Sequence, residues 1–127
     1  MITAALIFTL FAAGLHVFIF YLESFAWTTR ALPVFGMSRE SAEQTKEMAY
    51  NQGFYNLFLA IIAAAGVLAH FAGDPAVGLA LMLAGTGSML AAAAVLFITS
   101  PDKRSAAIKQ GTFPLLAVIL LFLGAFL

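Results

Sequence analysis

Two ionisable residues, His16 and Glu23, lie inside the first hydrophobic run of the chain. An ionisable side chain at membrane depth is costly, so it usually faces the protein interior and often marks a functional site. The two residues are seven positions apart, about two helical turns, which places them on one face of a helix. Such a pair can titrate, bind a ligand, or serve as an acid and a base.

The composition excludes several classes of protein. The chain has 127 residues, of which 63% are hydrophobic and 9% are charged, whereas an ordinary soluble domain is about 25% charged. Net charge is zero and there is no basic tract, which argues against nucleic acid as a partner. The chain has no cysteine, so thiol catalysis, disulfides and thiolate metal sites are excluded.

Four apolar runs predict an all-α membrane protein, a bundle of four transmembrane helices. The approximate spans are residues 2–27, 50–71, 76–98 and 106–127, and together they form one integral membrane domain. The first run lacks a positively charged start and is too long for a signal peptide, so we interpret it as a retained helix. Pro114 fits the opening turn or a mild kink of the last helix.

The only sizeable polar segment, residues 28–49, separates the first two spans. Leu32 precedes Pro33, and this pair is expected to end the first helix. Ser38 is a good N-cap for a helix over residues 39–48, in which Arg39 and Glu43 form an i,i+4 pair. The segment therefore predicts a short amphipathic cytoplasmic helix that leads into the second span.

The distribution of cations predicts the orientation. All lysines and arginines fall in the first and third connections, so they share one side of the membrane; they are Arg30, Arg39, Lys46, Lys103, Arg104 and Lys109. The positive-inside rule makes that side cytoplasmic. Both termini are then expected outside.

This topology places several polar residues at one depth. Glu23 lies at the cytoplasmic boundary, and His16 lies roughly two turns within the core. The second helix enters from the same side, and its polar residues at positions 51, 52, 55 and 56 share a face. The candidate ligand- or proton-binding residues are His16, Glu23, Asn51, Gln52, Tyr55, Asn56 and Gln110.

Three interpretations of these residues remain open. In the first, the amides form hydrogen bonds between helices and Glu23 reaches interfacial water. In the second, the residues line a cavity for a small ligand or a proton. In the third, His16 and Glu23 act as acid and base of a membrane enzyme, although their spacing singles out no reaction and no catalytic residue is assigned. No metal or cofactor is predicted, because the seven-residue separation is unlike helical metal motifs and His70 lies on the opposite side.

The motifs LHVFIFYLESFAW (residues 15–27) and NQGFYNLFLA (residues 51–60) resemble the domain of unknown function 1304 family. That family consists of small bacterial four-helix membrane proteins, and the similarity covers essentially the whole chain. The resemblance implies a multi-pass protein of the bacterial inner membrane. It also implies that six of the candidates, all except Gln110, are family-type positions. It supplies no activity.

The leading functional hypothesis is binding or transport of a small lipophilic or protonatable molecule through a polar pocket at the cytoplasmic leaflet. The alternative is a structural or accessory subunit of a larger membrane complex. Glycine and alanine recur through the third span and permit close helix contact, which would suit docking to a partner. The expected partners are thus the lipid bilayer, a small lipophilic ligand, and a second copy or a membrane-complex protein.

Overall fold

The computed structural model describes all residues from 1 to 127, and every regular element in it is helical. Four elements are long: α1 (Ile2–Phe25), α3 (Arg39–Phe71), α4 (Pro75–Thr99) and α5 (Arg104–Phe126). Two are short: α2 (Ala31–Phe35) and the 3-10 turn η1 (Pro101–Lys103). α1, α3, α4 and the segment from η1 through α5 are long and apolar enough to cross a membrane. The prediction of an all-α chain with four such helices is confirmed.

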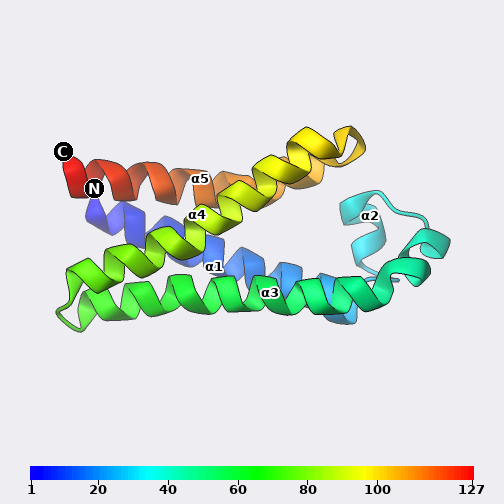
Figure 1. Cartoon of the computed structure of the whole chain (residues 1–127), viewed down its shortest axis with the longest axis horizontal. Coiled ribbons are helices and arrows are strands. Elements are labelled where there is room, and N and C mark those ends of the chain that lie inside the picture. Colours follow the sequence, from blue (N-terminus) through cyan, green and yellow to red (C-terminus); the bar gives the residue numbers. More distant parts are fainter.

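The four long helices form an antiparallel bundle (Figure 1). α1 and α4 each pack against both α3 and α5, while α1 and α4 barely touch each other. Both termini and the α3–α4 turn lie at one end, and α2 and the α4–α5 link lie at the other (Figure 1). All six cations lie either in the connections at the second end or near the starts of α3 and α5 there, so we call it the cationic end.

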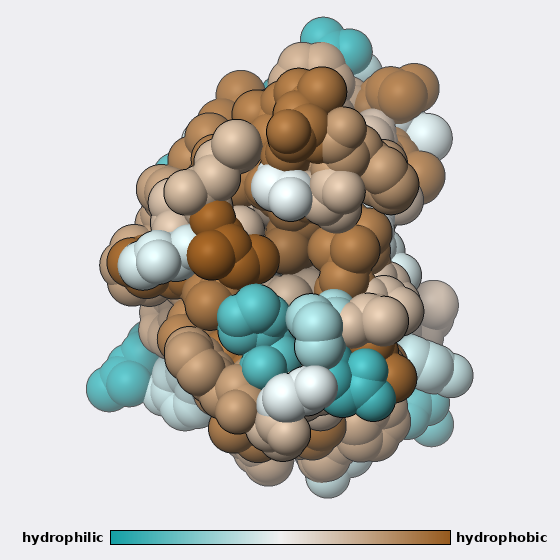
Figure 2. Space-filling model, turned by 90° about the vertical axis from the view of Figure 1, so that its left-hand side faces the viewer, coloured by the Kyte–Doolittle hydropathy of each residue, from teal (hydrophilic) through white to brown (hydrophobic).

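The opposite end has a different surface. Viewed from the termini, the molecule is mostly hydrophobic, with one compact hydrophilic patch (Figure 2). The α3–α4 connection at this end is a tight turn: Gly73 has φ of 93°, and the side chain of Asp74 accepts a hydrogen bond from Val77 N at 3.2 Å. The cap satisfies one of the free N–H groups at the start of α4.

The contact between α3 and α4 is made by small residues. A Cβ added to Gly66 would lie 2.6 Å from Met82 N and 2.8 Å from Gly78 O. One added to Gly85 would lie 2.9 Å from Ala63 N. The two backbones therefore approach more closely than any larger side chain would allow, which is the helix contact that the small residues predicted.

The first connection differs from the prediction. α1 ends at Phe25, well before Pro33, and Pro33 lies inside α2 instead of ending the first helix. Proline is tolerated there because it is the third residue of α2, where the missing N–H would have no intrahelical partner. Gly36, with φ of 65°, ends α2 in the left-handed conformation that glycine adopts without strain.

α3 is one continuous helix of 33 residues, so residues 39–48, predicted as a short helix that leads into the second span, are its first turns. Ser38 is the predicted N-cap: its hydroxyl accepts from Ser41 N at 3.1 Å. The expected Arg39–Glu43 pair does not form, because Glu43 pairs with Lys46 instead, at 3.3 Å. Pro114 also lies deeper than an opening turn, within α5, where its side chain is buried.

Candidate functional site

The site is centred on Glu23, near the end of α1. Glu23 is 4% exposed, and one carboxylate oxygen, Oε1, accepts a hydrogen bond from Asn56 Nδ2 on α3. The other oxygen has no hydrogen bond within the chain. Since no fully enclosed side-chain nitrogen or oxygen lacks a partner, this second oxygen borders space that a water molecule can enter.

No cation of the chain neutralises Glu23. The ion pairs in the structure are Lys46 with Glu43 and Lys103 with Asp102. A buried carboxylate is costly unless it is paired and hydrogen-bonded. Asn56 supplies a hydrogen bond but no charge, so an ionised Glu23 depends on water or on a cation from outside the chain for the rest of its stabilisation.

Close approach of α1 and α3 brings Glu23 and Asn56 together. Gly53 of α3 lies directly against Ser24 of α1, and a Cβ at Gly53 would come within 3.0 Å of Phe20 O and of Ser24 N. The Ser24 hydroxyl donates to Tyr50 O at 2.8 Å, one turn earlier in α3. These contacts fix the register of the two helices on either side of the Glu23–Asn56 hydrogen bond.

A cavity of about 400 Å³ opens beside Glu23 at the cationic end of the bundle. α1, α3 and α4 contribute to its wall, together with the segment after α2 and the start of α5. Four of the sequence-predicted residues line it: Glu23, Gln52, Asn56 and Gln110. The side chains of Gln52 and Gln110 form no hydrogen bonds within the chain, so their donors and acceptors are free to meet a ligand.

The other three predicted residues do not line this cavity. Asn51 and Tyr55 are exposed, and Tyr55 is 70% so. They therefore lie outside the cluster formed by Gln52 and Asn56. His16 is buried on α1, and its Nδ1 lies 2.9 Å from Ala12 O within the same helix. His16 and Glu23 share a helix face but make no direct contact.

Sequence analysis missed several residues of the cavity wall. Trp27 lines the cavity, and its indole N–H donates to Thr45 Oγ1 at 3.0 Å. Lys103 also lines it, but its ammonium group is held by Phe35 O at 3.3 Å and Asp102 at 3.6 Å. These residues belong to connections, whose positions depend on tertiary packing. The only signal in the sequence was the interfacial type of Trp27.

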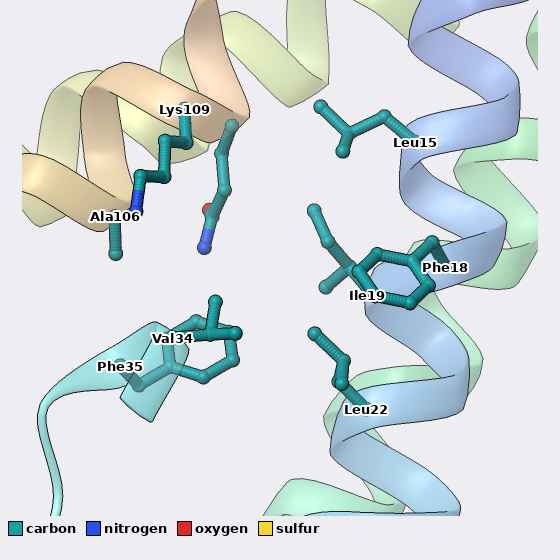
Figure 3. A pocket seen from close by; sticks show the side chains of 9 residues that line it. Leu15, Phe18, Ile19, Leu22, Val34, Phe35, Ala106 and Lys109 are labelled. Atoms are coloured by element: carbon teal, nitrogen blue, oxygen red, sulfur yellow. The ribbon is translucent and has the colours of Figure 1, made fainter. Parts of the chain in front are cut away.

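A second, smaller pocket lies between α1, α2 and α5 (Figure 3). Its volume is about 200 Å³, and seven of its nine lining residues are hydrophobic. Leu15, Ile19 and Leu22 project from α1 toward Val34 and Phe35 of α2 (Figure 3). Phe35 and Gln110 line both this apolar pocket and the larger polar cavity, so the two spaces are neighbours.

No three His, Cys, Asp or Glu residues lie close enough together to hold a metal ion. What the geometry offers instead is a buried carboxylate oxygen, two free carboxamides and an adjoining apolar pocket. These groups can hydrogen-bond and desolvate a small molecule.

The fold and site together define a small helical protein with four membrane-compatible helices and a partly polar interior at one end. The chain belongs to the family described as Protein of unknown function (DUF1304), whose model matches residues 10–122. This confirms the resemblance stated from the two motifs, and the match includes all seven predicted site residues. No curated protein and no solved structure matches the chain.

Proposed function

We propose that this protein is a multi-pass protein of the bacterial inner membrane that binds a small lipophilic or protonatable molecule in the polar cavity. One observation carries the proposal: Glu23 is almost fully buried, has no cationic partner, and lines a cavity of about 400 Å³. Pockets with a few convergent polar groups in a largely apolar setting are the usual form of small-molecule sites.

The proposed orientation follows from the cationic end. All six lysines and arginines lie in the connections at that end or near the starts of α3 and α5, and the positive-inside rule makes it cytoplasmic. The cavity then opens in the cytoplasmic leaflet, and both termini lie outside.

The free carboxamides favour binding over a purely structural role for the polar cluster. A structural clasp requires direct side-chain contacts, and the Glu23–Asn56 hydrogen bond is one. Gln52 and Gln110, however, face the cavity without such contacts. Gln52 is exposed and can be hydrated, but a clasp alone gives no reason for the half-buried, unpaired amide of Gln110 in the same cavity as an unpaired carboxylate oxygen.

The two other interpretations receive less support from the geometry. An acid–base pair is disfavoured because His16 does not line the cavity and does not contact Glu23. An accessory-subunit role relied on the small residues of α4 for docking to a partner. Two of those residues, Gly78 and Gly85, already pack against α3 within the chain.

Trp27 provides the test, because it is the only tryptophan and it lines the cavity. The protein in lipid nanodiscs is titrated with 1-octanol, octylamine and octanoic acid while Trp27 fluorescence is recorded. We expect a saturable change with at least one of these compounds. Ala92→Phe fills the cavity from α4 and should abolish the saturable fluorescence change. Ala91→Phe, on the same helix but outside the cavity, should preserve that change. Absence of any saturable change in the wild type contradicts the proposal.

A further inference from the structure

We infer that the ligand is a single-chain amphiphile with a primary ammonium head, held with its head at Glu23 and its alkyl tail in the apolar pocket between α1, α2 and α5. This inference rests on the proposed function and specifies its ligand class. It joins two spaces that the structure places next to each other, one polar and one apolar.

The head assignment follows from the hydrogen-bonding groups in the polar cavity. A primary ammonium has three N–H donors and no acceptor. The cavity offers matching acceptors in the unbonded carboxylate oxygen of Glu23 and the side-chain carbonyls of Gln52 and Gln110. An ammonium would also neutralise a buried carboxylate that forms no ion pair with a lysine or arginine of the chain.

Lys103 is the only cation that lines the polar cavity, and it is already engaged. Its Nζ donates to Phe35 O and lies beside Asp102. This places the lysine on the wall near α2 and leaves the carboxylate of Glu23 without a positive charge. A negatively charged head would have to meet Glu23 in the same cavity, so the charge distribution favours a cationic head.

The tail assignment follows from the composition of the second pocket. Leu15, Phe18, Ile19 and Leu22 form its α1 side, and Val34 and Phe35 form its α2 side (Figure 3). These two sides carry no polar group and can bury an alkyl chain, while the two polar lining residues, Lys109 and Gln110, both belong to α5. Leu22 faces this pocket and the next residue, Glu23, faces the polar cavity, so an extended amphiphile can contact both.

Phe35 of α2 and Gln110 of α5 line both spaces, so an amphiphile that contacts both would have to displace these two side chains. α2 is five residues long and is tied to the α4–α5 link through the hydrogen bond from Lys103 to Phe35 O. The alkyl chain therefore passes between Phe35 and Gln110.

The head group is tested in nanodiscs with probes of equal chain length. For each probe, the dissociation constant is obtained from the saturable part of the Trp27 fluorescence change, plotted against the free aqueous concentration of the probe. Octylamine is expected to bind about 10- to 100-fold more tightly than 1-octanol, as for a hydrogen bond to a charged group. Octyltrimethylammonium, which has the charge but no N–H donor, should bind more weakly than octylamine. Glu23→Gln should remove the preference for the amine.

The tail is tested by chain length. Affinity for hexylamine and octylamine is expected to rise about fourfold per methylene in the wild type. Val34→Phe fills the apolar pocket and should abolish this rise, while Val17→Phe, the same change on an exposed face of α1, should leave it intact.

The outcomes distinguish a wrong ligand class from a wrong function. Equal binding of octylamine and octanol overturns the ammonium head, and an unchanged chain-length dependence in Val34→Phe overturns the tail pocket. In both cases saturable binding that is lost in Ala92→Phe still supports the proposed function. If no probe binds saturably to the wild type, the proposed function itself fails.

Discussion

Gly53 of α3 lies so close to Ser24 of α1 that a single added carbon would meet the Ser24 hydroxyl and come within 3.0 Å of Phe20 O. This contact occurs one residue after Glu23 and three before Asn56. The glycine thus sets the separation of α1 and α3 at the place where their side chains meet in the site.

Gly53→Ala is therefore expected to push α3 away from α1 and to destabilise the protein by about 1–3 kcal/mol, as overpacking does. The measurement is thermal unfolding in detergent. Adding Ser24→Ala should restore only part of the stability, because the backbone atoms of Phe20 and Ser24 remain in the way. Wild-type stability in the single variant would contradict the close approach.

Asn56→Leu should lower stability because Glu23 loses the only hydrogen bond it receives within the chain. Leaving a buried acceptor unsatisfied costs about 1–3 kcal/mol. Asn51→Leu is the matched control: the same change at an exposed position of the same helix, expected to have little effect. A double-mutant cycle with Glu23→Gln should give a coupling of about 0.6–1.7 kcal/mol, the range for hydrogen bonds between membrane helices. Equal unfolding temperatures for the two leucine variants would exclude an energetic role for Asn56.

The α3–α4 contact predicts opposite effects for glycines on one helix. Gly85→Ala places a Cβ 2.9 Å from the backbone of Ala63 and should destabilise the bundle by about 1–3 kcal/mol. Gly87→Ala has nothing within 4 Å of the new carbon and should be neutral, or stabilise by up to about 1 kcal/mol through helix propensity. Thermal unfolding of both variants checks the prediction, which is wrong if they behave alike.

The absence of cysteine allows orientation to be tested with single introduced cysteines. Ala72→Cys lies in the α3–α4 turn, and Ser105→Cys lies at the start of α5; both positions are exposed. In spheroplasts, a membrane-impermeant maleimide should label Ala72→Cys and not Ser105→Cys, and lysis should make both reactive. The reverse pattern would place the cationic end outside.

The sequence predicts the long helices well and the connections poorly. Runs of apolar residues indicate membrane-compatible helices directly, because a helix that crosses a membrane needs about 20 such residues. The polar residues 39–48 suggested a short helix that leads into the second span, whereas the structure has one continuous helix from Arg39 to Phe71. No proline or glycine occurs between Arg39 and Gln52, so the helix continues through the change of polarity.

The candidate site was also predicted only in part. The predicted topology placed four polar residues near one depth, and in the structure all four line one cavity: Glu23, Gln52, Asn56 and Gln110. Asn51 and Tyr55 were grouped with them because i, i+1, i+4 and i+5 share a broad face. Successive residues are about 100° apart, however, so that face divides into two lines, and only the line of Gln52 and Asn56 borders the cavity, with Asn56 half-buried and Gln52 exposed. Which line faces α1 depends on helix rotation, which Gly53 determines through tertiary contact.

The length of α3 has a consequence for the host membrane. A helix of 33 residues is about 50 Å long, whereas a hydrocarbon core is about 30 Å thick, so α3 extends well beyond it. The polar cavity lies along the first half of α3, where the helix leaves the core under the proposed orientation. A thicker bilayer would surround the cavity with acyl chains, and a thinner one would leave it among headgroups and water. Occupancy of the site would then vary with hydrophobic mismatch, and lipid chain length would regulate binding without any contact to the ligand.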